Sequence, residues 1–392
     1  MNCERMNKKL SISFCIICTL FPVFFLYSTS IAGLTIADVI LLVWMLFGTY
    51  DIIIKRYYYV KRFQVSFILL TIDVFFVFLM VVFNGYSLAD SLKTGRYLVY
   101  LLATSVFGIR YINKNYFEKS YIVITVVASI YLILQALSWG FFRFKLPGYL
   151  PFLKITNSNS YQLVQFYATR ISVYRPCSVF AEPAHFASYV IGALALLIYR
   201  ERYLTALVVT LAIALSSSGT GIISAIIIWF IWLCLRQYYS LRLKHVVIII
   251  TILVASIVLI STNPQVQLFI KRTIITDSSI LGRFGGYSKF ADLFRQGKYF
   301  DRMFGHGITD VDIYLTGVLQ FIYSFGYIGT CLLVIGIIRI LLFGEKSSMI
   351  MIACLIVLSI GTQALVSYMI IIYIGYSIVL EEENQYECER DH

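Results

Sequence analysis

Long apolar segments separated by short polar connections make up almost the whole chain. About twelve such runs recur, most of them close to the roughly 18–22 residues with which an α-helix crosses about 30 Å of hydrocarbon. They lack the alternation of polar and apolar positions that marks the strands of a membrane barrel. Only helices and closed barrels satisfy their backbone in lipid, so the pattern predicts an all-α, polytopic bundle of membrane helices. The predicted spans are 10–27, 31–50, 64–83, 95–112, 120–139, 184–199, 203–217, 219–235, 246–262, 316–340, 348–363 and 366–380.

Two of these boundaries are left open by the sequence. Segments 203–217 and 219–235 are separated only by a cluster of small residues, Ser216 to Gly219. Residues 348–380 form either two short helices or one long helix with a re-entrant end. The first apolar run has no small-x-small cleavage site after it, which favours an uncleaved first span over a signal peptide.

The composition supports the same class of protein. Of the 392 residues, 60% are hydrophobic and only 13% are charged, a balance that excludes an ordinary soluble domain. We therefore expect one integral membrane domain, residues 1–392, with no nucleic-acid partner.

Positive charge is concentrated in alternate connections, and this predicts the sidedness of the chain. The basic residues that we place in the cytoplasm are Arg5, Lys8 and Lys9; Lys55, Arg56, Lys61 and Arg62; Arg110, Lys114 and Lys119; Arg200 and Arg202; Arg236, Arg242 and Lys244; and Arg339 and Lys346. Both termini are then cytoplasmic, including the acidic tail that begins at Glu381.

Two long connections, 140–183 and 263–315, lie on the outer side in this arrangement and carry most of the outer basic residues. Long loops escape the orientation rule, so their charge does not contradict the topology. One interpretation is general attraction to anionic lipid headgroups. The other is a site for a phosphate-bearing, lipid-linked substrate, because arginine binds phosphate in a bidentate manner.

The stretch RPCSVFAEPAHFASY at 175–189 holds the strongest candidates for chemistry, since charged groups beside an apolar span are costly. Arg175 is a candidate for binding an anion, or else it forms a structural ion pair with Glu182. Glu182 is a candidate general base or sugar ligand. Alternatively it marks the start of a helix, where a carboxylate and the following Pro183 are both favoured. His185 is interpreted as a helix-end residue.

The second long loop contains its own set of polar groups. Gly285 and Gly286 after Arg283 allow a close approach of backbone to a ligand. His306 lies between two glycines and is either a proton-transfer group or a turn residue. Asp310 and Asp312 imitate the acidic pair that holds a metal in many sugar transferases, but nucleotide sugars are not expected outside the cytoplasm. We expect no metal and no cofactor.

Within the predicted spans, Asp38 and Asp73 are the notable charges. Asp73 is near the middle of its helix, where an acidic group suits a proton or cation relay. The alternative, which we favour, is a partner inside the bundle such as a tyrosine or serine.

Several motifs together resemble the Wzy-type polysaccharide polymerases, which belong with the O-antigen ligases. RPCSVFAEP at 175–183 is similar to their Arg-x-x-[Gly/Ser]-x-Phe-x-Glu-Pro stretch. The other similar segments, spread over nearly the whole chain, are GLTIADVILL at 33–42, LSSSGTGIISAII at 215–227, GRFGGY at 282–287, FGHG at 304–307 and LTGVLQFIYSFGYIG at 315–329. One departure is that ligases carry a His-Asn pair where the second loop enters its helix, and DVDIYLTG stands there instead.

This resemblance implies a metal-independent membrane glycosyltransferase at the outer face of the bacterial cytoplasmic membrane. It implies a polyprenyl-diphosphate-linked glycan as donor and a repeat unit on the same carrier as acceptor, giving long O-antigen or capsular polysaccharide. Membrane lipids, a chain-length regulator and a flippase are the expected partners. Arg175, Arg283 and Arg170 would bind the leaving diphosphate, while Glu182, or else His306, would take the proton from the attacking hydroxyl.

Two alternatives remain open at this point. A ligase would move a finished glycan to another acceptor with the same donor chemistry. A lipid-glycan flippase or ion-coupled transporter would use Asp38 and Asp73, although the chain shows no duplicated halves of the kind that such transporters have.

Overall fold

The computed structural model is all-helical in the residues that it describes, apart from two isolated bridge pairs near residue 28. The predicted all-α class is therefore confirmed for this part of the chain. The described residues are 2–29, 31, 33–55, 64–150, 152–155, 174–237, 289–295, 297–309, 311 and 313–379.

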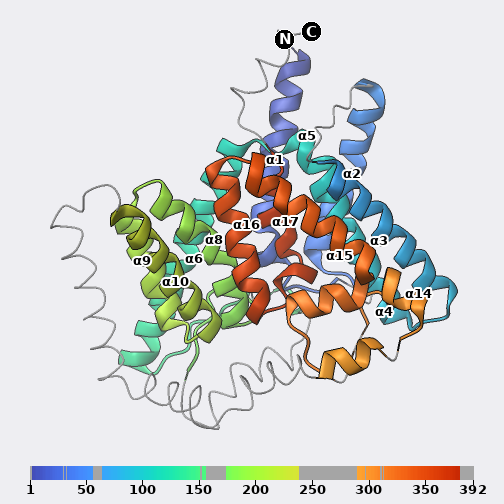
Figure 1. Ribbon diagram of the computed structural model, residues 1–392. Coiled ribbons are helices and arrows are strands. Elements are labelled where there is room, and N and C mark those ends of the chain that lie inside the picture. Colours follow the sequence, from blue (N-terminus) through green and yellow to red (C-terminus); the bar gives the residue numbers. More distant parts are fainter. Residues whose placement is uncertain are drawn as a thin grey trace.

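The helices of the first half extend between two ends of a bundle, which we name after the first helix (Figure 1). α1 begins at the proximal end and finishes at the distal end. In chain order these helices are α1 (Asn2–Phe24), α2 (Ile36–Lys55), α3 (Val65–Phe83), α4 (Leu88–Leu102), the π-helical turn η1 (Ala103–Gly108), α5 (Ile109–Tyr111) and α6 (Lys114–Phe142).

The second half continues the bundle. It consists of α8 (Pro183–Tyr199), α9 (Tyr203–Leu215), α10 (Gly219–Gln237), the short α14 (Tyr299–Phe304), α15 (Gly317–Phe343), α16 (Lys346–Gly361), the 3₁₀ turn η2 (Ala364–Val366) and α17 (Met369–Ser377). α9 and α10 pack beside α6 and α8 on one side, while α3, α4, α14 and α15 pack together on the other.

Local sequence explains several of the helix starts. The Ser87 hydroxyl accepts a hydrogen bond from the Asp90 backbone N–H at the start of α4, and the Asn113 side chain does the same for Tyr116 at the start of α6. Pro183 occupies the first turn of α8, where a missing N–H costs nothing.

Four helices are long and apolar enough to cross a membrane: α2, α3, α6 and α15. Their windows have mean hydropathies between 1.9 and 2.8, and large apolar side chains such as Leu46 and Phe83 are exposed on the outside of the bundle. These features are consistent with a helical membrane protein whose outer surface faces lipid.

The structure does not establish the predicted twelve spans. α8, α9, α10 and α16 are apolar but shorter, and the predicted span 246–262 lies outside the described residues. The predicted span 95–112 is instead a helix that begins at Leu88 and changes to a π-helical turn. Residues 348–380 form the first of the two expected alternatives, short helices joined by a 3₁₀ turn.

α8 is the centre of the bundle, because it is apolar on all sides and nearly all of its side chains are buried. Its backbone is bound by tyrosines from other helices. The Tyr373 hydroxyl donates to the Ser188 carbonyl at 2.6 Å, and the Tyr121 hydroxyl donates to the Tyr189 carbonyl. A side chain at Gly192 would overlap both tyrosines, so close packing here requires glycine.

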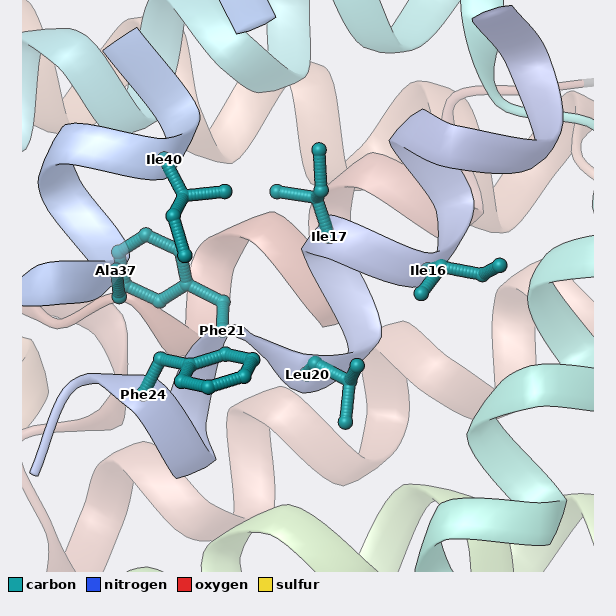
Figure 2. A pocket seen from close by; sticks show the side chains of 7 residues that line it. All are labelled: Ile16, Ile17, Leu20, Phe21, Phe24, Ala37 and Ile40. Atoms are coloured by element: carbon teal, nitrogen blue, oxygen red, sulfur yellow. The ribbon is translucent and has the colours of Figure 1, made fainter. Parts of the chain in front are cut away.

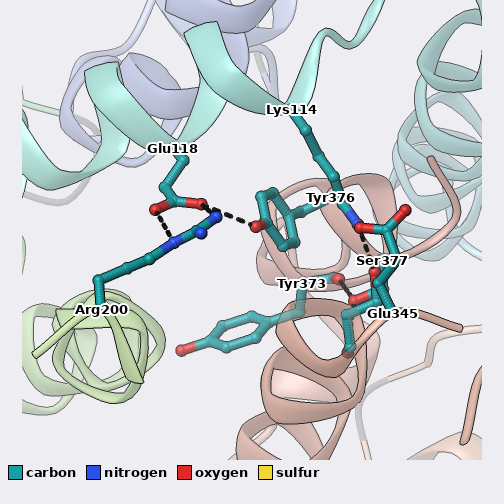
Figure 3. Close-up of polar contacts among 8 residues, drawn as sticks. Lys114, Glu118, Arg200, Glu345, Tyr373, Tyr376 and Ser377 are labelled. Atoms are coloured by element: carbon teal, nitrogen blue, oxygen red, sulfur yellow. Dashed lines mark hydrogen bonds and ion pairs between the residues drawn. The ribbon is translucent and has the colours of Figure 1, made fainter. Parts of the chain in front are cut away.

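Ion pairs connect four helices at the proximal end (Figure 3). Lys114 of α6 pairs with Glu345 beside α16, and its ammonium lies 5.1 Å from the Tyr376 ring centroid. Glu118 of α6 accepts two 2.9 Å hydrogen bonds from Arg200, next to α8. The Tyr376 hydroxyl of α17 donates to the same carboxylate at 3.0 Å. We call these residues the proximal ion-pair cluster.

Lys114→Met is expected to destabilise the bundle by about 1–3 kcal/mol. This is less than the roughly 3–5 kcal/mol lost when a fully buried pair is broken, because the Glu345 side chain is 21% exposed and can be hydrated. Thermal unfolding in detergent measures the change. Lys119→Met, on an exposed position of the same helix, is the control and is expected to leave the unfolding temperature unchanged. Equal losses in both variants would contradict the assignment.

Candidate functional site

The segment that precedes α8 is docked onto α6 by one amide side chain. The Ser178 backbone N–H donates to Gln135 Oε1 at 2.8 Å, and Gln135 Nε2 donates to the Ser178 carbonyl at 3.2 Å. The Ser178 hydroxyl also donates to the Ala128 carbonyl. Ser178 has a φ of 57°, a left-handed conformation that these three bonds hold in place. The segment 174–182 is therefore fixed relative to the bundle.

Gln135→Leu is expected to cost about 2–4 kcal/mol of folding stability, because it leaves a buried N–H and a buried carbonyl of Ser178 without their partner. Thermal unfolding and protease sensitivity after residue 174 measure the change. Ser138→Ala, one turn further along α6, removes only an exposed hydrogen bond to Phe144 and is expected to have little effect. A fully stable Gln135→Leu protein would show that the segment is held by other contacts.

Aromatic packing holds the remainder of this segment. Phe180 is fully buried, and its ring centroid lies 5.8 Å from that of Phe186 and 5.1 Å from that of Tyr189, both on α8. Tyr174, at the other end of the segment, packs on Trp139 of α6. Burial raises the pKa of the Tyr174 phenol, so this group stays protonated at neutral pH.

Arg175 connects this segment to the junction of α9 and α10. Its Nη2 donates to the Ser217 carbonyl at 3.2 Å. Ser217 has a φ of 55° in the tight turn between the two helices. The first turn of α10 packs directly on α8, since a side chain at Gly221 would lie 2.5 Å from the Ala187 Cβ. Two motifs far apart in the sequence, at 175–183 and 215–227, thus meet at the distal end.

Glu182 and His185 lie half-exposed beside this contact, at the distal start of α8. Glu182 occupies the N-cap position but its side chain makes no capping hydrogen bond. Its Oε1 instead lies 3.4 Å from His185 Nε2, with the two side chains 39% and 41% exposed. The His185 ring is 6.3 Å from the ring of the buried Tyr368.

The alternative interpretation of Arg175, an ion pair with Glu182, is not found: Arg175 donates to the Ser217 carbonyl, and Glu182 lies beside His185. A carboxylate that is exposed and uncommitted to a cap remains accessible to a ligand. Glu182 thus lies at the start of a helix, as one of its two interpretations predicted, and its side chain is not used in a cap.

Asp38 forms a second polar group on the same distal end, at the start of α2. The backbone N–H and hydroxyl of Thr35 donate to its Oδ2 at 2.9 and 2.7 Å, and the Tyr100 hydroxyl donates to its Oδ1 at 2.8 Å. Arg96 of α4 approaches Oδ2 with its Nε at 3.3 Å. Asp38 thus has several partners inside the bundle, one of them a tyrosine.

Asp73 differs from Asp38, since the structure shows no partner for its buried Oδ2 among the described residues. It is 7% exposed and faces Gly329 of α15, where an added Cβ would lie 2.8 Å from Oδ2. The tyrosine or serine partner predicted for this residue is therefore not found in the described part of the chain.

His306 is held in a separate set of contacts by a break in α15. Gly326 has φ 60° and ψ −162°, so the helix is interrupted there and exposes its backbone. The backbone N–H groups of His306 and Gly307 donate to the carbonyls of Tyr323 and Ser324 at 3.2 and 2.9 Å. Gly305 passes so close that a side chain would overlap Ser324. FGHG is therefore a backbone-paired segment rather than a free turn.

The His306 side chain packs flat on an aromatic ring. Its ring centroid lies 4.6 Å from that of Tyr323, with an interplanar angle of 5°. Nε2 is 3.9 Å from Asp301 Oδ2, while the buried Nδ1 has no partner among the described residues. Burial, and then the charge of Asp301, raise the pKa of the nearby Tyr86 phenol. The imidazole is only 15% exposed, which restricts its access to substrate.

The structure places Glu182 beside His185 at the start of α8 and Arg175 against the turn between α9 and α10, and it puts His306 in a different set of contacts. Arg170 and Arg283 lie outside the described residues, as do Gly285, Gly286, Asp310 and Asp312. Among the residues that are described, no group of three or more His, Cys, Asp or Glu side chains could hold a metal ion.

Three important residues were not found by sequence reasoning: Gln135, Arg96 and Tyr368. Gln135 and Tyr368 lie inside predicted spans, and the sequence around them does not distinguish them from the other polar residues there. Arg96 had one signal, its position as a cation in a short outer connection that otherwise carries little positive charge.

A shallow apolar pocket lies between α1 and α2 and contains none of the candidate residues (Figure 2). It is lined by Ile16, Ile17, Leu20, Phe21 and Phe24 of α1 and by Ala37 and Ile40 of α2. Its lining has no polar group, so it offers no chemistry of its own.

Comparison of the chain with family models, with curated proteins and with solved structures gives no match.

Proposed function

We propose that the chain is a polysaccharide polymerase of the Wzy type, which joins polyprenyl-diphosphate-linked repeat units at the outer face of the bacterial cytoplasmic membrane. The observation that carries this proposal is the Arg175–Ser217 contact. It joins two of the motifs on which the resemblance rests, next to an exposed carboxylate at the mouth of the central helix. The distal end is then the outer end, and both termini are cytoplasmic.

In the proposed reaction, a hydroxyl of the acceptor sugar attacks the anomeric carbon of the donor glycan. Glu182 takes the hydroxyl proton while the new glycosidic bond forms. The bond between the anomeric carbon and the carrier diphosphate breaks, and the leaving diphosphate gains negative charge. Arg175 stabilises that charge from a position fixed before the reaction begins.

The remaining candidates have supporting roles in this proposal. Arg283 and Arg170, from the two long outer connections, add positive charge around the diphosphate. His306 is the second candidate base. Its stacking on Tyr323 and its low exposure favour Glu182 for direct contact with the substrate.

The proximal ion-pair cluster supports an enzyme over a transporter. A transporter that alternates between two openings must separate its helices at each end in turn. Here α6, α8, α16 and α17 are joined at the proximal end by charged and aromatic contacts. A reaction at one face needs no opening at the other, so these contacts agree with the proposal. A flippase and a chain-length regulator of the same pathway would act beside it.

A deletion strain tests the proposal and separates it from ligation. Loss of a polymerase leaves surface glycans with one repeat unit attached, whereas loss of a ligase leaves none attached. We expect single-unit glycans, and restoration of long chains by the intact gene. Normal chain lengths in the deletion strain, or the absence of all attached glycan, would contradict the proposed function.

A further inference from the structure

Arg96 has hydrogen-bonding capacity that the described part of the chain does not use. Its buried Nε lies 3.3 Å from Asp38 Oδ2 without a hydrogen bond, and no described residue accepts a hydrogen bond from its terminal nitrogens. The guanidinium lies over the Phe25 ring, with Cζ 5.7 Å from the centroid. The side chain is 23% exposed, so it is recessed from the surface but still accessible. The terminal fork of a guanidinium matches two oxygens of a phosphate group.

Asp38 holds this arginine in position at Nε and leaves the terminal nitrogens without a hydrogen bond to it. The carboxylate is already satisfied by neutral donors, two from Thr35 and one from Tyr100. It therefore does not depend on Arg96 for solvation, and the printed approach, 3.3 Å, is to Nε. The end of the guanidinium that binds anions in a bidentate manner is left for a ligand.

Arg96 is connected to the site at α8 by aromatic contacts. The Phe25 ring beneath it lies 4.5 Å from the Tyr368 ring, and Tyr368 in turn lies 6.3 Å from His185. On another face of α4, Thr94 accepts a hydrogen bond from Ile308, just after the FGHG segment. Arg96 thus lies on the helix that borders both sets of candidate catalytic groups.

The apolar pocket between α1 and α2, whose lining Figure 2 shows, is connected to this arginine through Phe25. The Phe25 ring beneath Arg96 lies 6.1 Å from the ring of Phe21. Phe21 lines the pocket and packs edge-on against Tyr100, whose hydroxyl binds Asp38. Ala37, also in the lining, immediately precedes Asp38. The lining continues along α1 from Phe24 at the distal end towards Ile16, nearer the middle of the helix. A cation one aromatic ring away from an apolar pocket fits a lipid with an anionic head.

We propose that Arg96 and the α1–α2 pocket form a second lipid-diphosphate site, distinct from that at Arg175. Arg96 binds the diphosphate of a polyprenyl carrier, and the pocket takes the first isoprene units of its chain. This inference rests on the proposed function, in which both donor and acceptor are carried on polyprenyl diphosphate. Two such substrates require two places for a diphosphate at the same face, and α1, α2 and α4 provide the second.

Binding of sugar-free polyprenyl diphosphate to the full-length protein in nanodiscs of zwitterionic lipid tests the site, with bound lipid counted by native mass spectrometry. We expect two carriers on the wild-type protein and one on Arg96→Gln, with the affinity of the lost site reduced at least about tenfold. Arg96→Lys keeps the positive charge beside Asp38 but lacks the fork, so it should fold normally and bind weakly. Ala37→Phe should fill the pocket and weaken binding with the arginine intact.

Two controls identify the source of any binding. Lys93→Gln, on the same helix and paired with Asp90, should bind both carriers as the wild type does. Inorganic pyrophosphate should bind far more weakly than the lipid, and equal binding would show that the pocket contributes nothing. Two carriers on Arg96→Gln and Arg96→Lys would overturn the proposed site.

The outcomes for the site and for the function are separable. If Arg96→Gln loses one carrier but the deletion strain makes normal long chains, the lipid site stands and the polymerase fails. If the deletion strain makes single-unit glycans but Arg96→Gln binds two carriers, the polymerase stands and the second site fails.

Discussion

Gly326→Ala is expected to unfold the distal part of α15 and release the FGHG segment. The backbone at this position has φ 60° and ψ −162°, a region that is essentially restricted to glycine and costs another residue about 1–3 kcal/mol. An added Cβ would also lie 2.4 Å from the Met303 carbonyl oxygen and 2.7 Å from the Gly305 nitrogen. Since both neighbours are backbone, overpacking adds roughly 1–3 kcal/mol more. A marked fall in the unfolding temperature in detergent is the expected result.

Alanine substitutions at two other glycines distinguish the effect of backbone strain from that of steric overlap on the unfolding temperature. Gly85 has a φ of 73° but open space around it, so Gly85→Ala measures the strain without the overlap. Gly140→Ala introduces neither strain nor contact within α6 and should be neutral or slightly stabilising. The account expects the order Gly326, Gly85, Gly140 from largest to smallest loss. A Gly326→Ala protein as stable as the Gly85→Ala protein would show that the segment is not packed against the helix break.

Arg175→Ala is expected to reduce polymerisation by about 100- to 1,000-fold, the scale of losing one prepositioned donor to a developing negative charge. Surface glycans in a strain carrying this variant should shorten to one or a few repeat units. Gel separation of the glycans measures the distribution, and immunoblotting confirms that the protein reaches the membrane. Arg175→Lys keeps the charge but loses the planar fork, so an intermediate length is expected.

Arg175→Ala also removes the hydrogen bond to the Ser217 carbonyl, and a less stable protein would shorten the glycans as well. A control variant and the unfolding temperature separate the two effects. Arg202→Ala removes an exposed arginine at the opposite end of the bundle and should leave both stability and chain length unchanged. If Arg175→Ala retains the wild-type unfolding temperature and shortens the glycans, the effect belongs to the reaction. Long chains from stable Arg175→Ala protein would remove Arg175 from the mechanism.

The sequence predicts several helices well, but it does not predict how the segment before α8 packs on α6. Apolar runs of helical length identified α3 and α8 to within a few residues, because burial and lipid contact both require such runs. The contact of Gln135 with Ser178 joins positions far apart in the chain, and no spacing rule predicts it. The break in α15 could not be predicted either. YSFG reads as helix there, and only pairing with FGHG stabilises the interruption.

The sequence predicted part of the candidate site, and Glu182, Asp38 and Asp73 show why it did not predict the rest. Charge beside an apolar run correctly marked Glu182 as lying at the start of a helix. It did not predict that the carboxylate lies beside His185 and not beside Arg175. Asp38 and Asp73 look alike in the sequence. Asp38 lies at a helix start beside Thr35 and Tyr100, whereas the buried Oδ2 of Asp73 faces a glycine. Such differences arise from tertiary packing.

Product formation by the purified protein tests the central claim most directly. The protein is reconstituted into vesicles with polyprenyl-diphosphate-linked repeat units, in the presence of a chelator and without nucleotide sugars, and the lipid-linked glycans are separated by length. The account predicts a ladder of multiples of the repeat unit, lost in Glu182→Gln and strongly reduced in Arg175→Ala. Repeat units that remain single with wild-type protein that is correctly folded, or a ladder that requires added metal or nucleotide sugar, would contradict it.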